Sequence, residues 1–435
     1  MENTQDTIFL TGRAGTGKST LLSYFRQNSK KNIAVVSPTG IAAMNIGGQT
    51  IHSFFDFPLT YIDPQAIHSS RKLKAIYENI ETIVVDEISM VRADMLDGMD
   101  KALRVNKNST QLFGGVQMIF IGDLFQLPPV VADDNSKRYL AERYDTPYFF
   151  SAKVFSQSDQ ADIFDKPFID NLRYVELESI FRQKDIDFKN VLNRIRVGKV
   201  EEQDLDLLNT RLIHIPFNVA NTGVQHVESL QTEPITLTTT NKVANNINTI
   251  RLEEINSKEF IYNADISGDY PEKSYPTDLD LKLKIGAQVM MLKNDQERRF
   301  VNGSLGVIDY LDPNSVSVRI GEVSYKIEKS DWRVIEYGWS SESKRLEEVE
   351  KGSFHQYPLK LAWAVTIHKS QGQTFDKVKI NLGTGAFAHG QLYVALSRCK
   401  SLEGISLTRK VNLSDVIVDA RVQEFVGKVS VKLLN

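Results

Sequence analysis

Four short apolar segments follow one another through the first third of the chain, and each leads into polar residues and a helical pattern. They occupy residues 7–11, 32–40, 83–85 and 116–122. The segment 83–85 is wholly apolar, as in a strand that is covered on both faces of a parallel sheet. Strands that alternate with helices in this way predict a doubly wound α/β domain over residues 1–170.

The helical pattern gives way to short strand-like runs between Ile250 and Lys360. These runs occupy residues 287–295, 304–311, 315–320, 323–327 and 332–337. Turn residues separate them, namely Gly303, Gly306, Asn314 and Gly321. The pattern predicts a small β-barrel, SH3-like in size.

The composition is that of a globular protein with ample material for buried cores. Of 435 residues, 41% are hydrophobic and 25% are charged, which fits two to four domains. No run of about 18 apolar residues predicts a membrane span, and the first residues lack the pattern of a secretion signal. We therefore expect no membrane partner and a location in the cytoplasm, or in a nucleoid or nucleus.

The single cysteine, Cys399, excludes a disulfide framework and a cysteine-based metal site. The seven histidines are scattered without the spacing of metal ligands. A net charge of −3 gives no sign of a nucleic-acid partner. Any nucleic-acid site would have to be a local basic groove on a mildly acidic body.

The clearest chemical motif is the P-loop pattern G-x-x-x-x-G-K-S, which runs from Gly12 to Ser19 between a strand and a helix pattern. Backbone N–H groups and the helix N-terminus would hold the phosphates of ATP, and Lys18 would reach the β- and γ-phosphates. The Ser19 hydroxyl would bind Mg²⁺. The residues expected to bind the nucleotide are Gly12, Ala14, Gly15, Thr16, Gly17, Lys18, Ser19 and Thr20, with Gly372 from the second half of the chain.

Two acids, Asp86 and Glu87, follow the apolar strand 83–85, at the edge where ligands of open α/β sheets bind. Asp86 is expected to hold Mg²⁺, and Glu87 to orient and deprotonate the attacking water. The alternative is a solvated pair of surface acids. Gln126, after the next strand, would sense the γ-phosphate or orient the water; the alternative is a turn glutamine before Pro128.

Two arginines in the second half of the chain, Arg182 and Arg398, are candidates for arginine fingers. Phosphoryl transfer gains most from positive charge on the γ-phosphate in the transition state. Taken alone, an arginine of this kind is more often an ordinary helix-surface residue, and it is the surrounding pattern that favours the finger role.

Two stretches share a design in which an apolar strand runs into Thr, Asn or Gly and then opens a helix. They are VVSPTGIAAMN and ITLTTTNKVANNIN. Such strand ends present hydroxyl and N–H groups to phosphates, and a pair of them suits a continuous phosphate backbone. Plain helix N-caps are the alternative. A third donor-rich turn, 366–371, precedes Gly372, and its His368 has no neighbours that would make it a metal ligand.

These motifs, in this order, resemble superfamily 1 DNA helicases, and specifically the Pif-type branch related to RecD-like enzymes. The matching stretches are GRAGTGKST, SPTGIAAMNIGGQTIHSFF, VVDEISMV, FGGVQMIFIGDLFQLPPV, ESIFRQ, AVTIHKSQGQTFD and GQLYVALSRC. The segment between the second and third of the chemical motifs, MVRADMLDGMDKALRVNKNSTQLFGGVQ, resembles the family's signature. The resemblance extends from end to end of the chain.

The resemblance implies two RecA-like domains with ATP between them and single-stranded DNA across both. The implied divisions are 1–57 and 80–170 for the first domain, 58–79 for a wedge-type insertion, 171–250 and 358–435 for the second domain, and 251–357 for the SH3-like insertion. It assigns catalysis to Lys18, Glu87, Gln126, Arg182 and Arg398, and Mg²⁺ to Ser19 and Asp86. Family members read adenine with an upstream glutamine, and here only Gln5 stands in that region.

The resemblance also implies a 5′-to-3′ helicase with roles in DNA repair, recombination or telomere-like maintenance. Its partners would be single-stranded DNA and junctions with duplex DNA, and a monomeric helicase core is expected. The expected DNA contacts are Pro38, Thr39, Gly40, His52, Ser53, Phe54, Thr239, Asn241, Thr366, His368 and Lys369. For Phe54, stacking on a base competes with ordinary burial. The alternatives are an RNA-directed helicase and a nucleotide-dependent switch that binds a protein without translocating.

Overall fold

The computed structural model describes residues 1–71, 73–131, 133–156, 172–213 and 232–430. The chain divides into two compact units. The first unit contains residues 1–181, 333–352 and 419–435, and the second contains 182–332 and 353–418. The chain therefore enters the first unit three times.

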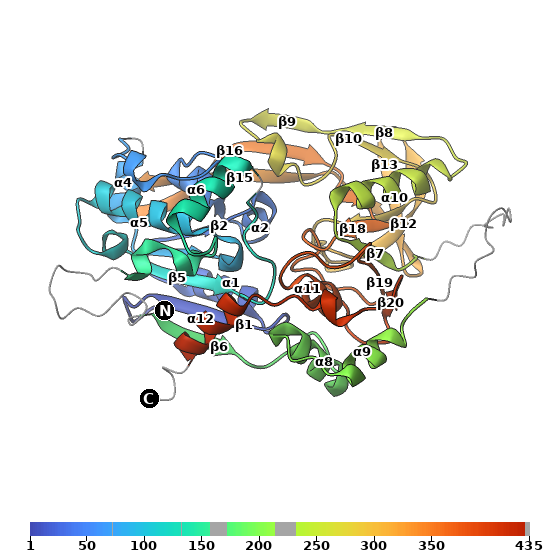
Figure 1. Cartoon of the computed structure of the whole chain (residues 1–435). Coiled ribbons are helices and arrows are strands. Elements are labelled where there is room, and N and C mark those ends of the chain that lie inside the picture. The colour runs from blue at the N-terminus through green and yellow to red at the C-terminus, as the bar shows by residue number, and fades with distance from the viewer. Residues whose placement is uncertain (72, 132, 157–171, 214–231, 431–435) are drawn as a thin grey trace. The chain divides into compact units, whose positions relative to one another are not determined.

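The first unit is built on a six-stranded parallel sheet (Figure 1). In spatial order its strands are β3 (Gln49–Thr50), β2 (Ile33–Ser37), β4 (Thr82–Val85), β5 (Gln117–Gly122), β1 (Ile8–Gly12) and β6 (Arg173–Leu177). Every residue of β1, β4 and β5 is buried, because helices cover both faces of the sheet. The predicted parallel α/β architecture is confirmed.

Some helices of the first unit begin at a residue whose side chain caps the helix N-terminus, and others do not. They are α1 (Lys18–Asn28), α2 (Gly40–Asn45), α3 (Ile51–Phe55), α4 (Lys74–Asn79), α5 (Ala93–Lys107), α6 (Asp134–Arg143) and α12 (Ala420–Ser430). Short 3₁₀ turns are η1 (Pro64–Ala66), η2 (Ile88–Met90), η3 (Leu112–Gly115), η4 (Phe149–Ser151) and η5 (Lys153–Ser156). The Thr39 and Thr50 hydroxyls accept hydrogen bonds from Ala42 N and Ser53 N and so cap α2 and α3.

Two segments that we predicted in the second domain lie in the first unit. Strand β6 extends the first sheet, with Gly12 opposite Leu177, so the boundary near residue 170 is wrong. Helix α12 packs beside β1 (Figure 1), where the Phe425 ring lies 6.4 Å from Phe9 and 5.9 Å from Phe149. Both segments were assigned to the second domain by their place in the chain, but order along the chain does not say which sheet a strand joins or against which sheet a helix packs.

The second unit contains a four-stranded parallel sheet. Its spatial order is β18 (Ala364–Thr366), β7 (Ile235–Thr238), β19 (Val378–Asn381) and β20 (Ile405–Leu407). Its helices are α8 (Ile186–Val197), α9 (Glu202–Asn209), α10 (Asn241–Glu253) and α11 (Gln391–Ser397), with the 3₁₀ turn η7 (Leu413–Asp415). The strands β7, β18 and β19 end at the same edge, because they run parallel.

The expected β-rich insertion is present between α10 and β18. A five-stranded antiparallel sheet has the order β14 (Val323–Ile327), β13 (Ser315–Ile320), β12 (Leu305–Asp312), β11 (Gln288–Met291) and β17 (Leu359–Leu361). Beside it are β8 (Phe260–Asn263) with β10 (Asp280–Leu283), the strand β9 (Asp265–Gly268) and the 3₁₀ turn η6 (Glu272–Ser274). A core of side chains such as Leu281, Val289, Ile308 and Val318 is fully buried.

A long hairpin, β15 (Ser330–Ser340) and β16 (Arg345–Gln356), leaves this insertion, and its far part belongs to the first unit. The Tyr337 hydroxyl accepts a hydrogen bond from Val35 N at 3.1 Å, and Tyr337 N donates to Gln49 Oε1 at 3.3 Å. Arg26 forms an ion pair with Glu348. The predicted insertion 251–357 is therefore not one body, because these specific bonds hold residues 333–352 against β2 and β3.

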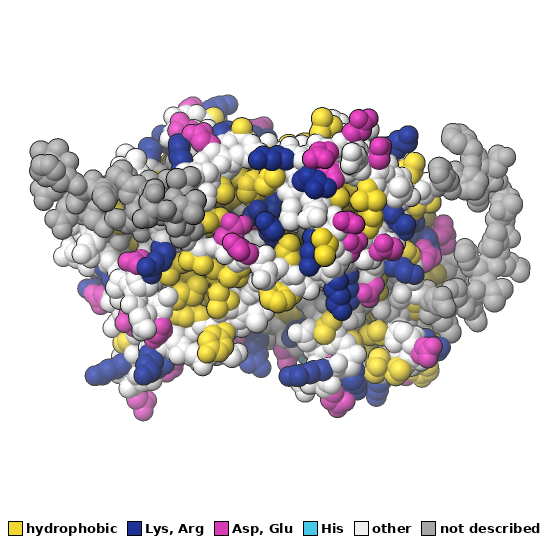
Figure 2. All heavy atoms as spheres, turned by 90° about the horizontal axis from the view of Figure 1, so that it is seen from below, with side chains coloured by type: hydrophobic (Ala, Val, Ile, Leu, Met, Phe, Trp, Pro, Cys, Tyr) yellow, Lys and Arg dark blue, Asp and Glu magenta, His cyan; other side chains and the backbone are white. Residues whose placement is uncertain are grey.

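On the face seen in Figure 2, Lys and Arg side chains are interspersed with Asp and Glu side chains among the described residues. This mixture agrees with the small net charge of −3. None of the described helices has the length and hydropathy needed to cross a membrane.

Candidate functional site

Two backbone carbonyl groups of the P-loop accept hydrogen bonds from the Lys18 ammonium group. Its Nζ atom donates to Gly12 O at 2.6 Å and to Arg13 O at 3.1 Å. Gly15 and Gly17 have φ angles of 82° and 88°, values that favour glycine. A Cβ atom on Gly12 would lie 2.8 Å from Leu177 O, so the loop passes too close to the β6 backbone for any side chain.

The first turn of α1 continues this loop. Gly17 caps the helix, Lys18 is its first residue, and Ser19 and Thr20 are exposed. The first N–H groups of a helix have no partner within it and carry partial positive charge. The nucleotide-binding residues predicted in the first half of the chain, Gly12 to Thr20, thus form one continuous anion-binding loop.

Asp86 and Glu87 follow β4, as predicted, and they have different environments. Asp86 N donates to Val36 O at 2.9 Å. Burial raises the pKa of Asp86, while a hydrogen bond from the Glu87 backbone and the charge of Lys18 oppose that rise. Glu87 lies in the left-handed region, with φ 52° and ψ 45°, a conformation that costs about 1 kcal/mol or more for a non-glycine residue. The alternative of a solvated acid pair is wrong, because Asp86 is buried.

The end of strand β5 packs against the residue that follows Glu87. A Cβ atom on Gly122 would lie 2.9 Å from Ile88 Cγ2 and 3.1 Å from Ile88 N. The end of β5 therefore packs directly against the turn that begins at Glu87. Gln126 is 7% exposed, and its Nε2 donates to Asp123 Oδ2 at 3.3 Å. This bond orients the Gln126 amide. It is compatible both with a role at the γ-phosphate or the attacking water and with an ordinary turn glutamine.

The second unit brings Arg182 and Arg398 together at Ser397. Arg182 Nη1 donates to Ser397 O at 3.1 Å, and Arg398 Nη2 donates to Ser397 Oγ at 2.9 Å. Gln183 Nε2 joins them by donating to Ser397 O at 3.1 Å and to Cys399 O at 2.9 Å. Burial lowers the pKa of Arg182. The alternative of an ordinary surface arginine is wrong for Arg398, which is buried, whereas Arg182 is half-buried and both of its interpretations remain.

Arg398 also holds the turn that contains Gly372. It is 1% exposed, its Nε donates to Val394 O at 3.0 Å, and its Nη1 lies 3.4 Å from both Ser370 O and Gln373 O. Gly372 has φ 77°, and a Cβ atom there would meet no neighbour. The structure therefore places Gly372 within one turn of Arg398.

Two polar atoms in the same turn, Gln371 Nε2 and Gln373 Oε1, are buried and have no hydrogen-bond partner in the structure. Leaving such an atom unpaired costs about 1–3 kcal/mol, so it demands an explanation. A bound ligand would supply one. Burial lowers the pKa of His368 in this turn. No cluster of three or more His, Cys, Asp or Glu side chains suited to a metal ion occurs in the described ranges.

The candidate DNA contacts of the first unit lie at the starts of α2 and α3. Thr39 and Gly40 open α2, directly after Pro38, and His52 and Ser53 lie in the first turn of α3. Burial and the charge of Arg92 lower the pKa of His52 to about 4. His52 Nε2 is buried without a hydrogen-bond partner, so His52 is neutral near pH 7 and is poorly placed for a charged contact with phosphate.

The prediction that Phe54 contacts DNA by stacking is wrong. Phe54 is 3% exposed. Its ring packs against Phe55 at 4.9 Å, Tyr77 at 5.9 Å and Tyr337 at 5.8 Å. An aromatic ring enclosed on these sides has no free face for a base.

The candidate DNA contacts of the second unit lie at the shared edge of β7 and β18. Thr366 pairs with Thr238, so Thr239 follows at the same edge. Asn241 opens α10 and is exposed, and Lys369 is also exposed. Thr366 is 4% exposed, and its hydroxyl accepts a hydrogen bond from Lys369 N at 3.2 Å. The Thr366 hydroxyl therefore shapes the turn, which corrects its prediction as a surface contact.

Sequence reasoning missed Phe181, Gln183 and Ser397. Phe181 is 75% exposed, although its backbone N–H donates to the P-loop carbonyl Gly15 O at 2.9 Å. Its position directly before Arg182 was a usable signal. The Gln183 side-chain amide donates to backbone carbonyls, and Ser397 accepts through its carbonyl and hydroxyl oxygens. A sequence motif does not reveal the positions of these partners.

The P-loop, the acids after β4 and the parallel sheet together define the first unit as a P-loop nucleotide-binding fold. Comparison with known families agrees. Residues 1–206 match the model described as PIF1-like helicase, and residues 274–311 match the model described as DNA helicase Pif1, 2B domain.

Known relatives cover nearly the whole chain. ATP-dependent DNA helicase PIF1 of Homo sapiens is 32% identical over 92% of this chain and 57% of its own length. ATP-dependent DNA helicase Pif1 of Bdellovibrio bacteriovorus is 31% identical over 97% of this chain and 88% of its own length. The chain belongs to the PIF1-like helicase family. It spans from 57% to 61% of the length of the yeast, Emericella nidulans, human, zebrafish and rat relatives.

Solved structures agree as well. Bacteroides sp Pif1 in complex with ADP-AlF4 has a TM-score of 0.85 and 38% identity, covering 98% of this chain and 94% of that chain. Bacteroides Pif1 bound to ssDNA has a TM-score of 0.67 and 38% identity, with coverage of 98% and 94%.

Proposed function

We propose that this chain is an ATP-dependent DNA helicase that moves 5′-to-3′ on single-stranded DNA and unwinds duplex or structured DNA. One observation carries the proposal: each unit contains some of the residues that ATP hydrolysis requires. The first has the P-loop with Asp86 and Glu87, and the second has Arg182 and Arg398 joined at Ser397. A nucleotidase that needs groups from two units can couple hydrolysis to their motion.

In the proposed reaction, Lys18 and the N–H groups of the P-loop hold the β- and γ-phosphates. Glu87 orients the attacking water and takes its proton, while Arg182 and Arg398 stabilise the charge that develops on the transferring phosphoryl group. Gln126 is the candidate for positioning the water, since Asp123 orients its amide.

The residues fit Mg²⁺, a hard cation that prefers oxygen ligands. Ser19 is exposed in the first turn of α1, and the Asp86 carboxylate lies within the electrostatic influence of Lys18. Ser19 and Asp86, the latter through water, would hold the ion, which would neutralise charge on the phosphates. The Glu87 N–H group and the Lys18 charge oppose the rise in the pKa of Asp86 that burial causes.

We propose that Phe181 provides a stacking face for the adenine base. The ring is exposed, and its backbone is tied to Gly15 of the P-loop. Stacking of an aromatic side chain on a base is worth about 1–3 kcal/mol. Gln5 is also exposed and remains the second candidate for reading adenine.

The remaining features follow the family. We take both parallel sheets as RecA-like domains and the five-stranded sheet as an SH3-like insertion. The segment 58–79, which holds only η1 and α4, would be the wedge at the duplex junction. The short first insertion and the β-rich second one support 5′-to-3′ movement, since the opposite branch carries large helical insertions in both halves. A structure of two coordinating Pif1 helicases for unwinding at forked dsDNA and one of Bacteroides Pif1 bound to ssDNA support DNA as the partner.

The test is the ATPase rate of the chain alone, with single-stranded DNA and with RNA. Strong stimulation by DNA supports the proposal. Equal or greater stimulation by RNA would favour an RNA-directed helicase, and no stimulation by either would favour a nucleotide-dependent switch.

A further inference from the structure

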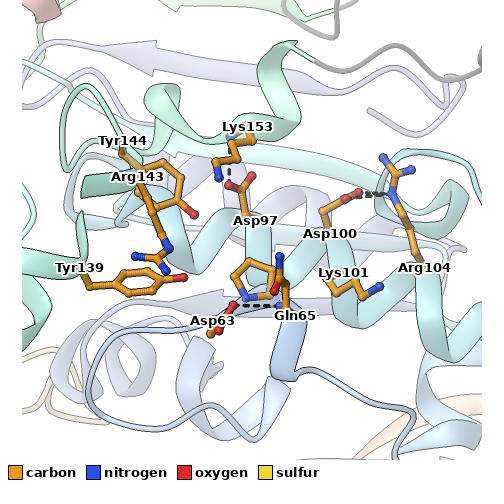
Figure 3. A pocket seen from close by; sticks show the side chains of 11 residues that line it. Asp63, Gln65, Asp97, Asp100, Lys101, Arg104, Tyr139, Arg143, Tyr144 and Lys153 are labelled. Atoms are coloured by element: carbon orange, nitrogen blue, oxygen red, sulfur yellow. Dashed lines mark hydrogen bonds and ion pairs between the residues drawn. The ribbon is translucent and has the colours of Figure 1, made fainter. Parts of the chain in front are cut away.

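A charged and aromatic groove lies on the first unit beside the segment 58–79, away from the P-loop residues. Two adjoining hollows form it, with volumes of about 320 and 470 Å³. They share Arg143, Tyr144 and Lys153 as lining residues. Figure 3 shows the first hollow, where η1, α5 and α6 contribute side chains to one space. The second hollow continues from it to α12.

Each acidic residue of the first hollow has a hydrogen-bond or ion-pair partner within the protein. Asp97 is 7% exposed and accepts hydrogen bonds from Lys153 N at 3.0 Å and Val154 N at 2.9 Å. Asp100 forms an ion pair with Arg104 at 2.8 Å. Asp63 accepts from Gln65 N at 3.0 Å. Among the described residues a cation balances the charge of Asp100 in the first hollow, and in the second hollow Glu424 pairs with Lys428 at 2.8 Å while Asp145 adds a further acid.

Three cations of the groove have a weak ion pair or none with an acidic side chain of the described residues. Lys101 and Lys153 make no ion pair with any residue in the described ranges. Arg143 has only an exposed contact to Glu142, at 3.4 Å, and such surface pairs contribute about 0–1 kcal/mol. The groove thus presents three positive charges along one side of α5, α6 and η5.

Aromatic rings alternate with these cations. The Arg143 guanidinium group lies 4.2 Å from the centre of the Tyr139 ring, as Figure 3 shows, and the Lys153 ammonium group lies 5.6 Å from the Tyr144 ring. Tyr61, from the segment 58–79, stacks on Tyr139 at 4.2 Å and is 37% exposed. Burial raises the pKa of Tyr139 to about 12 and that of Tyr144 further, so neither phenol adds negative charge near pH 7.

We infer that this groove binds a second single strand of DNA, the strand displaced when the duplex opens. Positive charges that follow a backbone, combined with aromatic faces, are the chemistry of single-strand binding without sequence preference. Tyr61 links the groove to the segment that we propose as the wedge, where the two strands part. The inference rests on the proposed helicase function. The phosphates of the displaced strand would meet Lys101, Arg143 and Lys153.

The test compares two DNA substrates that share a 5′ loading tail and a duplex. One is a fork with a non-complementary 3′ tail on the displaced strand, and the other lacks that tail. The variant is Lys101→Gln/Arg143→Gln/Lys153→Gln in the full chain. Its control is Lys273→Gln/Lys282→Gln/Lys326→Gln, which removes the same charge from exposed positions of the second unit. The affinity of the unaltered chain and of each variant for each DNA substrate is measured over a range of salt concentrations. Thermal unfolding checks that both variants are folded.

For the unaltered chain, we expect the slope of log affinity against log salt concentration to be steeper for the fork than for the tailless substrate by about 2. The reason is that each single-strand phosphate that a cation neutralises contributes about 0.7 to the slope, and the groove offers three cations. The groove variant should lose this difference, and the control variant should keep it. Equal slopes for both substrates with the unaltered chain would overturn the inference, as would a groove variant that keeps the difference. Failure of the helicase proposal is a separate result, namely an ATPase of the unaltered chain that no single strand stimulates.

Discussion

Replacing Arg398 by alanine should destabilise the second unit far more than replacing Arg182. Arg398 is 1% exposed, and its Nε and Nη2 atoms make bonds of 3.0 and 2.9 Å to Val394 O and Ser397 Oγ. A hydrogen bond to a charged group contributes about 1.5–3 kcal/mol, so the loss of these two bonds costs about 3–6 kcal/mol. Arg182 is half-buried and has a single bond of 3.1 Å to Ser397 O, and losing such a bond costs about 1 kcal/mol.

Urea unfolding followed by tryptophan fluorescence measures this difference. Two of the three tryptophans, Trp332 and Trp363, are buried in the second unit. With a slope of about 3 kcal/mol per molar urea, Arg398→Ala should lower the midpoint by about 1 M, and Arg182→Ala by a third of that. Arg298→Ala, at an exposed position of the same unit, is the control and should leave the midpoint unchanged.

The same variants separate stability from catalysis. If both arginines are fingers, each variant that remains folded should lose turnover by about 10³-fold, so Arg182→Ala should be inactive yet nearly as stable as the parent. A midpoint for Arg398→Ala equal to that of the control would refute the structural reasoning. Near-normal turnover of Arg182→Ala would remove it from the catalytic role.

Three further predictions concern the nucleotide. Glu87→Gln should bind ATP with unchanged affinity but lose turnover, since the geometry survives and the base does not; a fluorescent ATP analogue and a phosphate-release assay separate the two effects. Lys18→Ala should lose both binding and turnover, because it removes the charge at the centre of the P-loop, and near-normal affinity would contradict its phosphate contact. Phe181→Ala should weaken ATP binding by about 5- to 100-fold, as expected from one stacking contact, whereas Phe181→Tyr should bind normally; equal loss in both variants would exclude stacking.

Much of the fold was predictable because its signals are local. The strands β1, β4 and β5 are rich in apolar residues, and motif residues follow each of them directly. The P-loop forms as expected because its glycines and the start of α1 lie in one uninterrupted stretch of chain. Each of these features depends on neighbours only a few residues away.

The missed features depend on contacts between distant parts of the chain. Helix α12 has an ordinary amphipathic pattern, and only the packing of Phe425 against Phe9 assigns it to the first unit. Tyr337 belongs to a hairpin that the sequence predicts as part of the insertion 251–357. Its hydrogen bonds to Val35 and Gln49 place it in the first unit instead. For Phe54 the sequence left stacking on a base and ordinary burial both open, and the Tyr77 and Tyr337 rings that enclose it decide for burial.

Strand displacement with two partial duplexes tests the central claim most directly. One duplex carries a 5′ single-stranded tail and the other a 3′ tail, and each is incubated with the chain, ATP and Mg²⁺. Glu87→Gln serves as the control for dependence on hydrolysis. The account predicts efficient unwinding of the 5′-tailed duplex, little unwinding of the 3′-tailed duplex and none with the variant. Unwinding of the 3′-tailed duplex alone would contradict the direction, and failure to unwind either duplex despite ATP hydrolysis would contradict the helicase itself.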